Sequence, residues 1–206
     1  MPLPKLLIAS NNLHKIAEFR RLFVDLPFGL VTPHDLGLNL DVDETGDTFE
    51  ANARLKAHAF AEASGLPALA DDSGIEVDAL NGRPGVHSAR YGGEGLDDNG
   101  RVQLLLREMA AVPDDQRACR YRVVLMLVGP YEPDGSEGSE DSTEGRCEGL
   151  VARETSGVNG FGYDPVFYIP AYGKTIAEIG PDQKDEISHR GKAARAMAEV
   201  LASRTA

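Results

Sequence analysis

Two groups of carboxylates have the residue types that a divalent cation requires. Asp71 and Asp72 are followed by Ser73 and Gly74, between two short apolar runs. The second group comprises Asp41, Asp43, Glu44, Asp47 and Glu50. Because Mg²⁺ in proteins binds a few carboxylates together with water and ligand phosphates, we expect these segments to supply a magnesium site. A carboxylate beside such a metal can also accept a proton from an attacking water molecule.

Asp71 and Asp72 are expected to play different parts. Successive side chains of a strand point to opposite faces, so at most one of the two faces a given ligand while the other bonds locally. The plainer interpretation is an Asx turn with surface carboxylates at a strand end. The residue types alone do not separate these two interpretations.

A polar turn near the N-terminus offers a place for phosphate groups. Ser10, Asn11 and Asn12 precede a helical pattern, and Lys15 falls in its first turn. A helix N-terminus presents unpaired N–H groups and a partial positive charge, to which asparagine amides and a lysine add donors. The segment is therefore suited to a triphosphate, although an Asn-capped surface helix has the same pattern. Gly173, Lys174 and Thr175 resemble the end of a Walker motif. That motif requires glycine five positions before Gly173, where this chain has Tyr168, so the motif is excluded.

Two later segments carry side chains suited to a purine base. Phe161 can stack on a base because Gly162 lets the backbone approach closely, and Asp164 can accept a base N–H. His189 and Arg190 can donate to a carbonyl oxygen. If Asp164, His189 and Arg190 face one pocket, they favour a 6-oxo purine, which presents an N1–H donor and an O6 acceptor. The plainer interpretation is a tight turn with a buried phenylalanine and a helix start with a solvated His-Arg pair.

Helical and strand patterns alternate along the chain and indicate an α/β or α+β sheet. We predict strands over residues 5–9, 29–32, 68–70, 75–77, 117–128, 147–154 and 166–169. We predict helices after residue 12, from an Asp47 cap to Gly65, over residues 98–109 and from about Ser188 onward. The length of 206 residues with 42% apolar content suits one globular domain or two close-packed lobes, and we predict a single two-lobed domain over residues 1–206.

The net charge of −12 excludes a protein that grips long nucleic acid by neutralising phosphates. The longest apolar run, residues 123–128, is far below the ~20 residues of a spanning helix, so no membrane segment is expected. The N-terminal pattern is not that of a signal peptide, and two cysteines form no metal or disulfide framework, so we expect a cytoplasmic protein. Residues 131–148 carry half of the net charge and are predicted to form a mobile surface loop.

Five segments together resemble the inosine/xanthosine triphosphate pyrophosphatase family. They are SNNLHK (10–15), ETGDTFEANA (44–53), LADDSGIEVDALNGRPGVHSARY (69–91), GFGYDPVF (160–167) and KDEISHRGKA (184–193). The resemblance implies Mg²⁺-dependent hydrolysis of dITP, ITP and XTP to the monophosphate and pyrophosphate, which cleans the nucleotide pool. It also implies an elongated mixed sheet with helices on both sides, an active-site cleft between two lobes, and a homodimer.

The resemblance also assigns roles to residues. Asp72 is implied as general base and metal ligand, Glu44 or Asp43 as the second metal carboxylate, and Ser73 as a substrate contact. Phosphate contacts are implied for Ser10, Asn11, Asn12, Leu13, His14 and Lys15. Nucleotide contacts are implied for Phe161, Gly162, Tyr163, Asp164, Lys184, His189 and Arg190, with Phe161 stacking and His189 and Arg190 reading the base.

The chain departs from the family pattern at Asn11, where glycine is common, and in its long acidic segment. The asparagine bears on how closely the turn approaches phosphate. Two other functions stay open: a pyrophosphatase for pyrimidine or other modified nucleotides, and a catalytically silent nucleotide-binding protein. The segments at 10–15 and 188–190 disfavour the first, and the presence of Asp72 disfavours the second.

Overall fold

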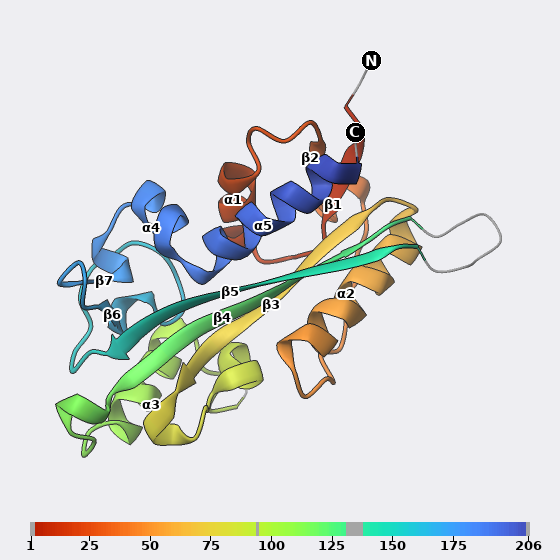
Figure 1. Ribbon diagram of the computed structural model, residues 1–206. Coiled ribbons are helices and arrows are strands. Elements are labelled where there is room, and N and C mark those ends of the chain that lie inside the picture. Colours follow the sequence, from red (N-terminus) through yellow and green to blue (C-terminus); the bar gives the residue numbers. More distant parts are fainter. Residues whose placement is uncertain (1–2, 94, 131–137, 205–206) are drawn as a thin grey trace. The chain divides into compact units, whose positions relative to one another are not determined.

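The computed structural model describes residues 3–93, 95–130 and 138–204, and its central element is one mixed sheet (Figure 1). The strand order is β2-β1-β3-β4-β5-β6-β7. The strands are β1 (Lys5–Ile8), β2 (Gly29–Val31), β3 (Ala68–Val77), β4 (Ala118–Val128), β5 (Glu140–Val151), β6 (Phe167–Ile169) and β7 (Lys174–Thr175). The predicted mixed sheet is confirmed.

Both strand directions occur within this sheet. β1 runs parallel to β2 and to β3, whereas β6 runs antiparallel to β5 and to β7. β4 and β5 are antiparallel neighbours, because Val151 N donates to Arg117 O at one end and Gly129 N donates to Ser139 O at the other. The parallel strands β2, β1 and β3 therefore form one edge of the sheet.

The helices are α1 (Leu13–Leu22), α2 (Phe49–Ser64), α3 (Asp98–Glu108), α4 (Pro181–Ile187) and α5 (His189–Arg204). The chain divides into two compact units: unit 1 comprises residues 1–72, 123–144 and 193–206, and unit 2 comprises residues 73–122 and 145–192. The predicted cleft between lobes and the single-domain organisation stay predictions. Within the described residues, no helix has the length and apolar character needed to cross a membrane.

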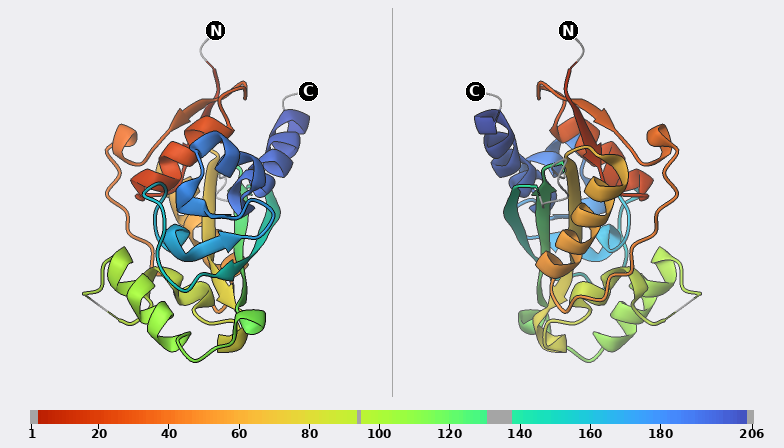
Figure 2. Two further views of the ribbon diagram at one scale, coloured as in Figure 1. Left: turned by 90° about the vertical axis from the view of Figure 1, so that its left-hand side faces the viewer. Right: turned by 90° about the vertical axis from the view of Figure 1, so that its right-hand side faces the viewer.

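Unit 1 has helices on both faces of its strands. α1 and the later part of α5 share a buried cluster with β1, β3 and β4 that includes Phe19, Leu69, Leu125 and Met197. α2 lies on the opposite side of these strands (Figures 1 and 2) and buries Phe49, Asn52, Ala53, Ala57, Phe60 and Ala61. Asn52 is the polar residue among these buried side chains, which indicates that this face of α2 has a role besides packing.

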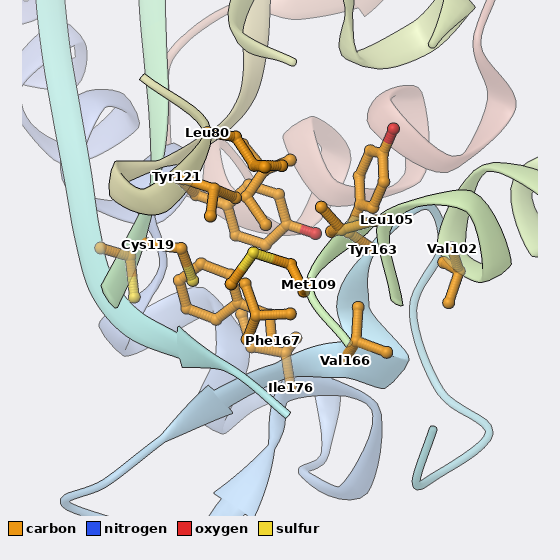
Figure 3. Packing of buried hydrophobic residues seen from close by; sticks show 14 of the residues in the cluster. Leu80, Val102, Leu105, Met109, Cys119, Tyr121, Tyr163, Val166, Phe167 and Ile176 are labelled. Atoms are coloured by element: carbon orange, nitrogen blue, oxygen red, sulfur yellow. The ribbon is translucent and has the colours of Figure 1, made fainter. Parts of the chain in front are cut away.

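Unit 2 has its own core (Figure 3). Its side chains come from β3, α3, the start of β4, β5 and residues 163–176, among other segments, and they include Leu105, Met109, Tyr121, Phe167 and Ile176. Arg117 is buried at the edge of this core, where its guanidinium donates to the carbonyls of Met109, Val112, Val151 and Ala152. Backbone carbonyl acceptors thus compensate for the burial of the Arg117 charge. The strand predicted from residue 117 begins one residue later, at Ala118.

The prediction of a turn at Asp71–Gly74 was wrong, because β3 continues unbroken through these residues. A buried strand tolerates polar side chains when each finds a partner, and here Asp71 pairs with Lys15, Asp72 with Asn52 and Ser73 with Arg190. A Cβ on Gly74 would lie 2.3 Å from the Gly85 carbonyl oxygen, so the missing side chain lets another segment approach the strand.

The prediction of a mobile surface loop over residues 131–148 was wrong for residues 140–148, which belong to a strand. β5 begins at Glu140, and its residues 140, 142, 144, 146 and 148 are exposed while 145, 147 and 149 are buried. The acidic side chains thus follow the solvent face of a strand, and the buried positions are Gly145, Cys147 and Gly149, which carry too little apolar bulk to reveal the alternation. Residues 131–137 lie outside the described part of the chain.

Smaller differences concern helix ends. α2 is capped by Thr48, whose hydroxyl accepts from Ala51 N, and not by Asp47. A separate helix, α4, precedes α5, and Ser188 lies between them. Asn12, Gly65 and the span of α3 match their predictions closely.

Candidate functional site

In unit 1, α2 brings an amide and a lysine to the predicted catalytic carboxylate. Asn52 and Lys56 are one helical turn apart and therefore lie on the same face of α2. The Asn52 amide donates to Asp72 Oδ2 at 3.0 Å, and Asn52 Oδ1 accepts from Gly46 N at 2.8 Å. Asn52 is fully buried, so it ties the loop before α2 to Asp72.

Lys56 joins the two carboxylates predicted to bind metal. Its ammonium lies 2.5 Å from Glu44 Oε1 and 3.7 Å from Asp72 Oδ1. Of the two residues left open for the second carboxylate, Glu44 belongs to this cluster, whereas Asp43 is exposed. Sequence reasoning had not singled out Lys56 or Asn52. The available signal was two polar residues spaced four apart on the same face as Phe49, Ala53, Ala57 and Phe60.

The electrostatics of this cluster are those of a partly desolvated charge group. Burial raises the pKa of Asp72 above its ordinary value and Glu44 adds to this, although Lys56, Lys15 and Asn52 oppose the rise. Burial alone would lower the pKa of Lys56, but the carboxylates of Asp72, Asp71 and Glu44 outweigh it and raise that pKa. The lysine therefore stays a cation between carboxylates.

The arrangement fits a divalent cation. Asp72 and Glu44 converge on one positive group, the Lys56 ammonium, which serves as a stand-in for a cation between them. Within the described residues, no group of three or more His, Cys, Asp or Glu side chains gathers around one point. Two carboxylates still match Mg²⁺, which often uses one or two carboxylates and takes its remaining ligands from water and phosphate.

The turn predicted to contact phosphates lies in unit 1, and part of its hydrogen-bonding capacity is used within the protein. Asn12 Oδ1 accepts from His14 N and Lys15 N at the start of α1, and Asn11 Nδ2 donates to Leu40 O. Asn12 N donates to Ser10 Oγ, and Leu13 is 79% exposed. Lys15 is paired with the buried Asp71 through a 3.0 Å contact, so this lysine is held near β3 and is not a freely moving surface cation.

Asp71 and Asp72 therefore divide as expected for neighbours in a strand. Asp71 contacts Lys15 of α1, and Asp72 contacts Asn52 and Lys56 of α2. The two helices cover opposite faces of the unit 1 strands (Figure 1). Each carboxylate thus has a lysine from its own side.

In unit 2, Asp164 is the centre of a second buried group. Its Oδ2 accepts from Lys184 Nζ at 2.6 Å and from Phe161 N at 2.9 Å, and its Oδ1 accepts from Tyr121 OH at 3.2 Å. Asp164 and Lys184 are both buried. With three protein donors around it, this carboxylate acts as an anchor for neighbouring groups.

Phe161 lies among cations of the same unit. Lys184 Nζ is 4.9 Å from the centre of the Phe161 ring, and Arg190 Cζ is 5.9 Å from it. Arg190 is 2% exposed, and one guanidinium nitrogen donates to Ser73 Oγ at 2.9 Å. The structure thus brings Ser73, Phe161, Asp164, Lys184 and Arg190 together within unit 2, as the prediction of one nucleotide-binding group requires.

His189 and Arg190 begin α5 close to the end of α4. The Ser188 hydroxyl accepts from Gly191 N, and a Cβ on Gly191 would lie 1.8 Å from the Asp185 carbonyl oxygen. Glycine at 191 is therefore required for the tight passage between the helices. His189 is buried, and its ring stacks on Tyr121 with 4.7 Å between ring centres.

Two residues of the predicted nucleotide group have structural contacts of their own. Tyr163 is buried in the unit 2 core (Figure 3), and its hydroxyl donates to the Ser88 carbonyl oxygen. Gly162 N donates to Asp98 Oδ2 at 3.0 Å. These bonds attach the 160–164 segment to the 85–98 region.

Comparisons with known proteins agree with this fold. Residues 6–200 match the model of the Ham1 family. The chain is 44% identical to a dITP/XTP pyrophosphatase of Desulforamulus reducens (96% of this chain, 95% of the relative) and 42% identical to a dITP/XTP pyrophosphatase of Escherichia coli K12 (96% and 98%). The structure of a HAM1 protein from Coxiella burnetii superposes with a TM-score of 0.86 at 40% identity and covers 98% of this chain and 100% of that one. On a family match that spans nearly the whole sequence, this chain belongs to the Ham1 family.

Proposed function

We propose that this protein hydrolyses deaminated purine nucleoside triphosphates, dITP, ITP and XTP, to the monophosphate and pyrophosphate. The observation that carries the proposal is the convergence of the buried Asp72 and of Glu44 on Lys56, in a chain of the Ham1 family. Relatives that cover nearly the full length are named dITP/XTP pyrophosphatases, which supports the same reaction.

In this proposal Asp72 accepts a proton from water. The oxygen of that water forms a bond to the α-phosphorus while the bond from this phosphorus to the bridging oxygen breaks, and pyrophosphate leaves with the bonding electrons. Burial favours a carboxylate that can take up a proton, and the Asn52 amide holds its second oxygen in place. A side chain that cannot accept a proton at this position should therefore remove most of the turnover.

A Mg²⁺ ion would be held by Asp72 and Glu44 and would neutralise charge on the phosphates. Lys15 and Lys56 offset part of the carboxylate charge from α1 and α2, and a bound cation would make the unit 1 cluster favourable for a polyanion. We propose that the turn from Ser10 to Lys15 contacts the phosphates, with Asn11 in place of the more open glycine.

The base is bound by the unit 2 group in this proposal. Phe161 supplies the stacking surface, and Lys184, His189 and Arg190 supply donors for the O6 of a 6-oxo purine. Asp164 accepts from three protein donors, which favours a role in holding Phe161 and Lys184 over direct contact with the base. We also propose that the protein is cytoplasmic and forms a homodimer.

The test is pyrophosphate release from ITP, XTP, dUTP, ATP and GTP, each with Mg²⁺ and with a chelator. The proposal expects release from ITP and XTP well above that from ATP and GTP, and loss of release on chelation. Preferred release from dUTP would favour a pyrimidine pyrophosphatase. Binding of ITP without release from any of the five would favour a silent nucleotide-binding protein.

A further inference from the structure

Tyr121 of β4 contacts both parts of the base-binding group in unit 2. Its hydroxyl donates to Asp164 Oδ1 at 3.2 Å, and its ring stacks on His189 with 4.7 Å between ring centres and 20° between planes. On the sequence it is one aromatic residue in a predicted strand, and sequence reasoning did not select it. The structure makes it the residue that touches both the Asp164 carboxylate and the His189 ring.

The neighbours of Tyr121 leave little freedom for either contact to shift. The side chain lies in the unit 2 core, and its ring also stacks on Phe167, with 4.4 Å between ring centres (Figure 3). Because Tyr121 belongs to a central strand of the sheet, its hydroxyl and ring face are presented from a rigid element. Burial, and then the nearby Asp164, raise the pKa of this phenol well above its ordinary value, so the hydroxyl stays a donor.

The contact with Asp164 extends to the groups that the base would meet. Asp164 Oδ2 holds Phe161 by its backbone N–H and Lys184 by its ammonium. The phenol thus fixes one side of a carboxylate whose other side fixes the stacking ring and a lysine. On its other contact, the stack sets the plane of the His189 imidazole.

We propose that Tyr121 is a positioning residue for recognition of the 6-oxo purine: its hydroxyl orients Asp164, and through it Phe161 and Lys184, while its ring orients His189. This inference rests on the proposed function, since it names what aligns the base-binding groups. It does not place Tyr121 in contact with the substrate.

The test is the Tyr121→Phe variant, which removes one oxygen and keeps the stacking ring. A hydrogen bond to a buried charged group has a value that corresponds to a roughly tenfold change in equilibrium. We expect kcat/KM for ITP to fall about tenfold, mostly through KM, with a smaller change for ATP, so that the ITP/ATP ratio falls. Tyr121→Leu, which also removes the stack, should lower the ratio further.

Tyr91→Phe is the matched control. Tyr91 lies in the same buried cluster, and within the described residues its hydroxyl makes no hydrogen bond to Asp164. Urea unfolding of each variant reports any shared loss of stability. Isothermal titration with IMP, the expected product, measures base recognition independently of turnover and should show the same order of variants.

The outcomes separate the inference from the function on which it rests. Wild-type protein that releases no pyrophosphate from ITP would overturn the proposed function and this inference with it. An active wild type, together with a Tyr121→Phe variant whose ITP/ATP ratio and IMP affinity equal those of Tyr91→Phe, would overturn the inference alone. A fall in the ratio confined to the Tyr121 variants would support it.

Discussion

Asp72 in unit 1 and Asp164 in unit 2 are both buried carboxylates, but their surroundings differ in kind. Asp72 meets an amide at 3.0 Å and a lysine only at 3.7 Å, and that lysine is shared with Glu44. Asp164 meets a lysine, a backbone N–H and a phenol, all within hydrogen-bond distance. Asp72 thus shares its lysine with a second carboxylate, whereas Asp164 has close donors on both of its oxygens.

This difference shows that burial alone does not identify the role of a carboxylate. A buried acid next to a functional segment suggests a catalytic or recognition role by residue type, and both aspartates satisfy that description. The donors around each one distinguish a group that can still gain a proton or a cation from one that organises a pocket. Substitutions at the two aspartates separate these two roles.

Replacing Asp72 by Asn should have the largest effect. The amide keeps the size of the side chain but cannot accept a proton from water, so we expect kcat for ITP to fall about 10³-fold, the middle of the range for general base catalysis. Nucleotide binding, measured by calorimetry with IMP, should change little. The matched variant Asp71→Asn removes the partner of Lys15 on the other strand face and should lose far less turnover.

Equal losses in Asp71→Asn and Asp72→Asn would contradict the division of roles between the two neighbours. Near-normal turnover of Asp72→Asn would remove Asp72 from the reaction altogether. Either result would show up in the same pyrophosphate assay.

Replacing Asp164 by Asn should act first on stability. It leaves the buried Lys184 ammonium without its counter-charge, and breaking one side of a buried ion pair costs about 3 kcal/mol in the free energy of unfolding. The double variant with Lys184→Met should recover part of this loss, because it also removes the uncompensated charge. Urea unfolding of the wild type, both single variants and the double variant completes the cycle.

The same variants also test the sequence-based idea that Asp164 reads the base N1–H. If Asp164 acts only through its neighbours, Asp164→Asn and Lys184→Met should lower the ITP/ATP ratio to a similar extent. A loss of selectivity in Asp164→Asn alone would restore a direct contact with the base.

Much of the fold could be predicted from local patterns. The start of α1 followed from Asn12, whose side chain accepts from the first turn of the helix, and α3 and β4 followed from apolar residues at helical or buried-strand spacing. These features depend on residues near one another in sequence. The continuous β3 did not follow, because Asp71, Asp72 and Ser73 are accommodated by partners up to 117 positions away.

The same physical reason explains what was missed in the site. Asn52 and Lys56 look like ordinary polar positions of an Ala-rich helix until the strand beneath them contributes Asp72. Asp164 resembles a base-reading residue by type, but in the structure it accepts from Tyr121 and Lys184. Residue type indicates which chemistry is available, and long-range pairing decides which residue performs it.

The choice between Glu44 and Asp43 tests which carboxylates share a cation with Asp72. Glu44 contacts Lys56 beside Asp72, whereas Asp43 is exposed. Glu44→Gln should raise the Mg²⁺ concentration for half-maximal activity at least about tenfold, since changes one shell further out already cost that much. Asp43→Asn should leave the Mg²⁺ requirement unchanged. The reverse pattern in a Mg²⁺ titration of ITP hydrolysis would move the second carboxylate to Asp43.

Glu140 extends the comparison to a carboxylate at the surface of unit 1. It accepts from Arg54 at 3.0 Å and lies against His58, and these hydrogen bonds, His58 first, lower the pKa of Glu140 below its ordinary 4.5. A lowered pKa in the folded state means that the contribution to stability is fully present above pH 4.5 and is lost as pH falls through the folded value. Because the side chain is 31% exposed, we expect only about 0.5 kcal/mol.

The measurement is the difference in the free energy of unfolding between wild type and Glu140→Gln, by urea denaturation at pH 7 and again well below pH 4.5. The difference should be present at pH 7 and vanish in acid, where the wild-type side chain is also neutral. A difference that persists in acid would mean that packing of the side chain, and not its charge, holds the start of β5 against α2. Glu140 would then differ from both Asp72 and Asp164. Its side chain would contribute through packing, whereas the roles of the two aspartates depend on their ionised form.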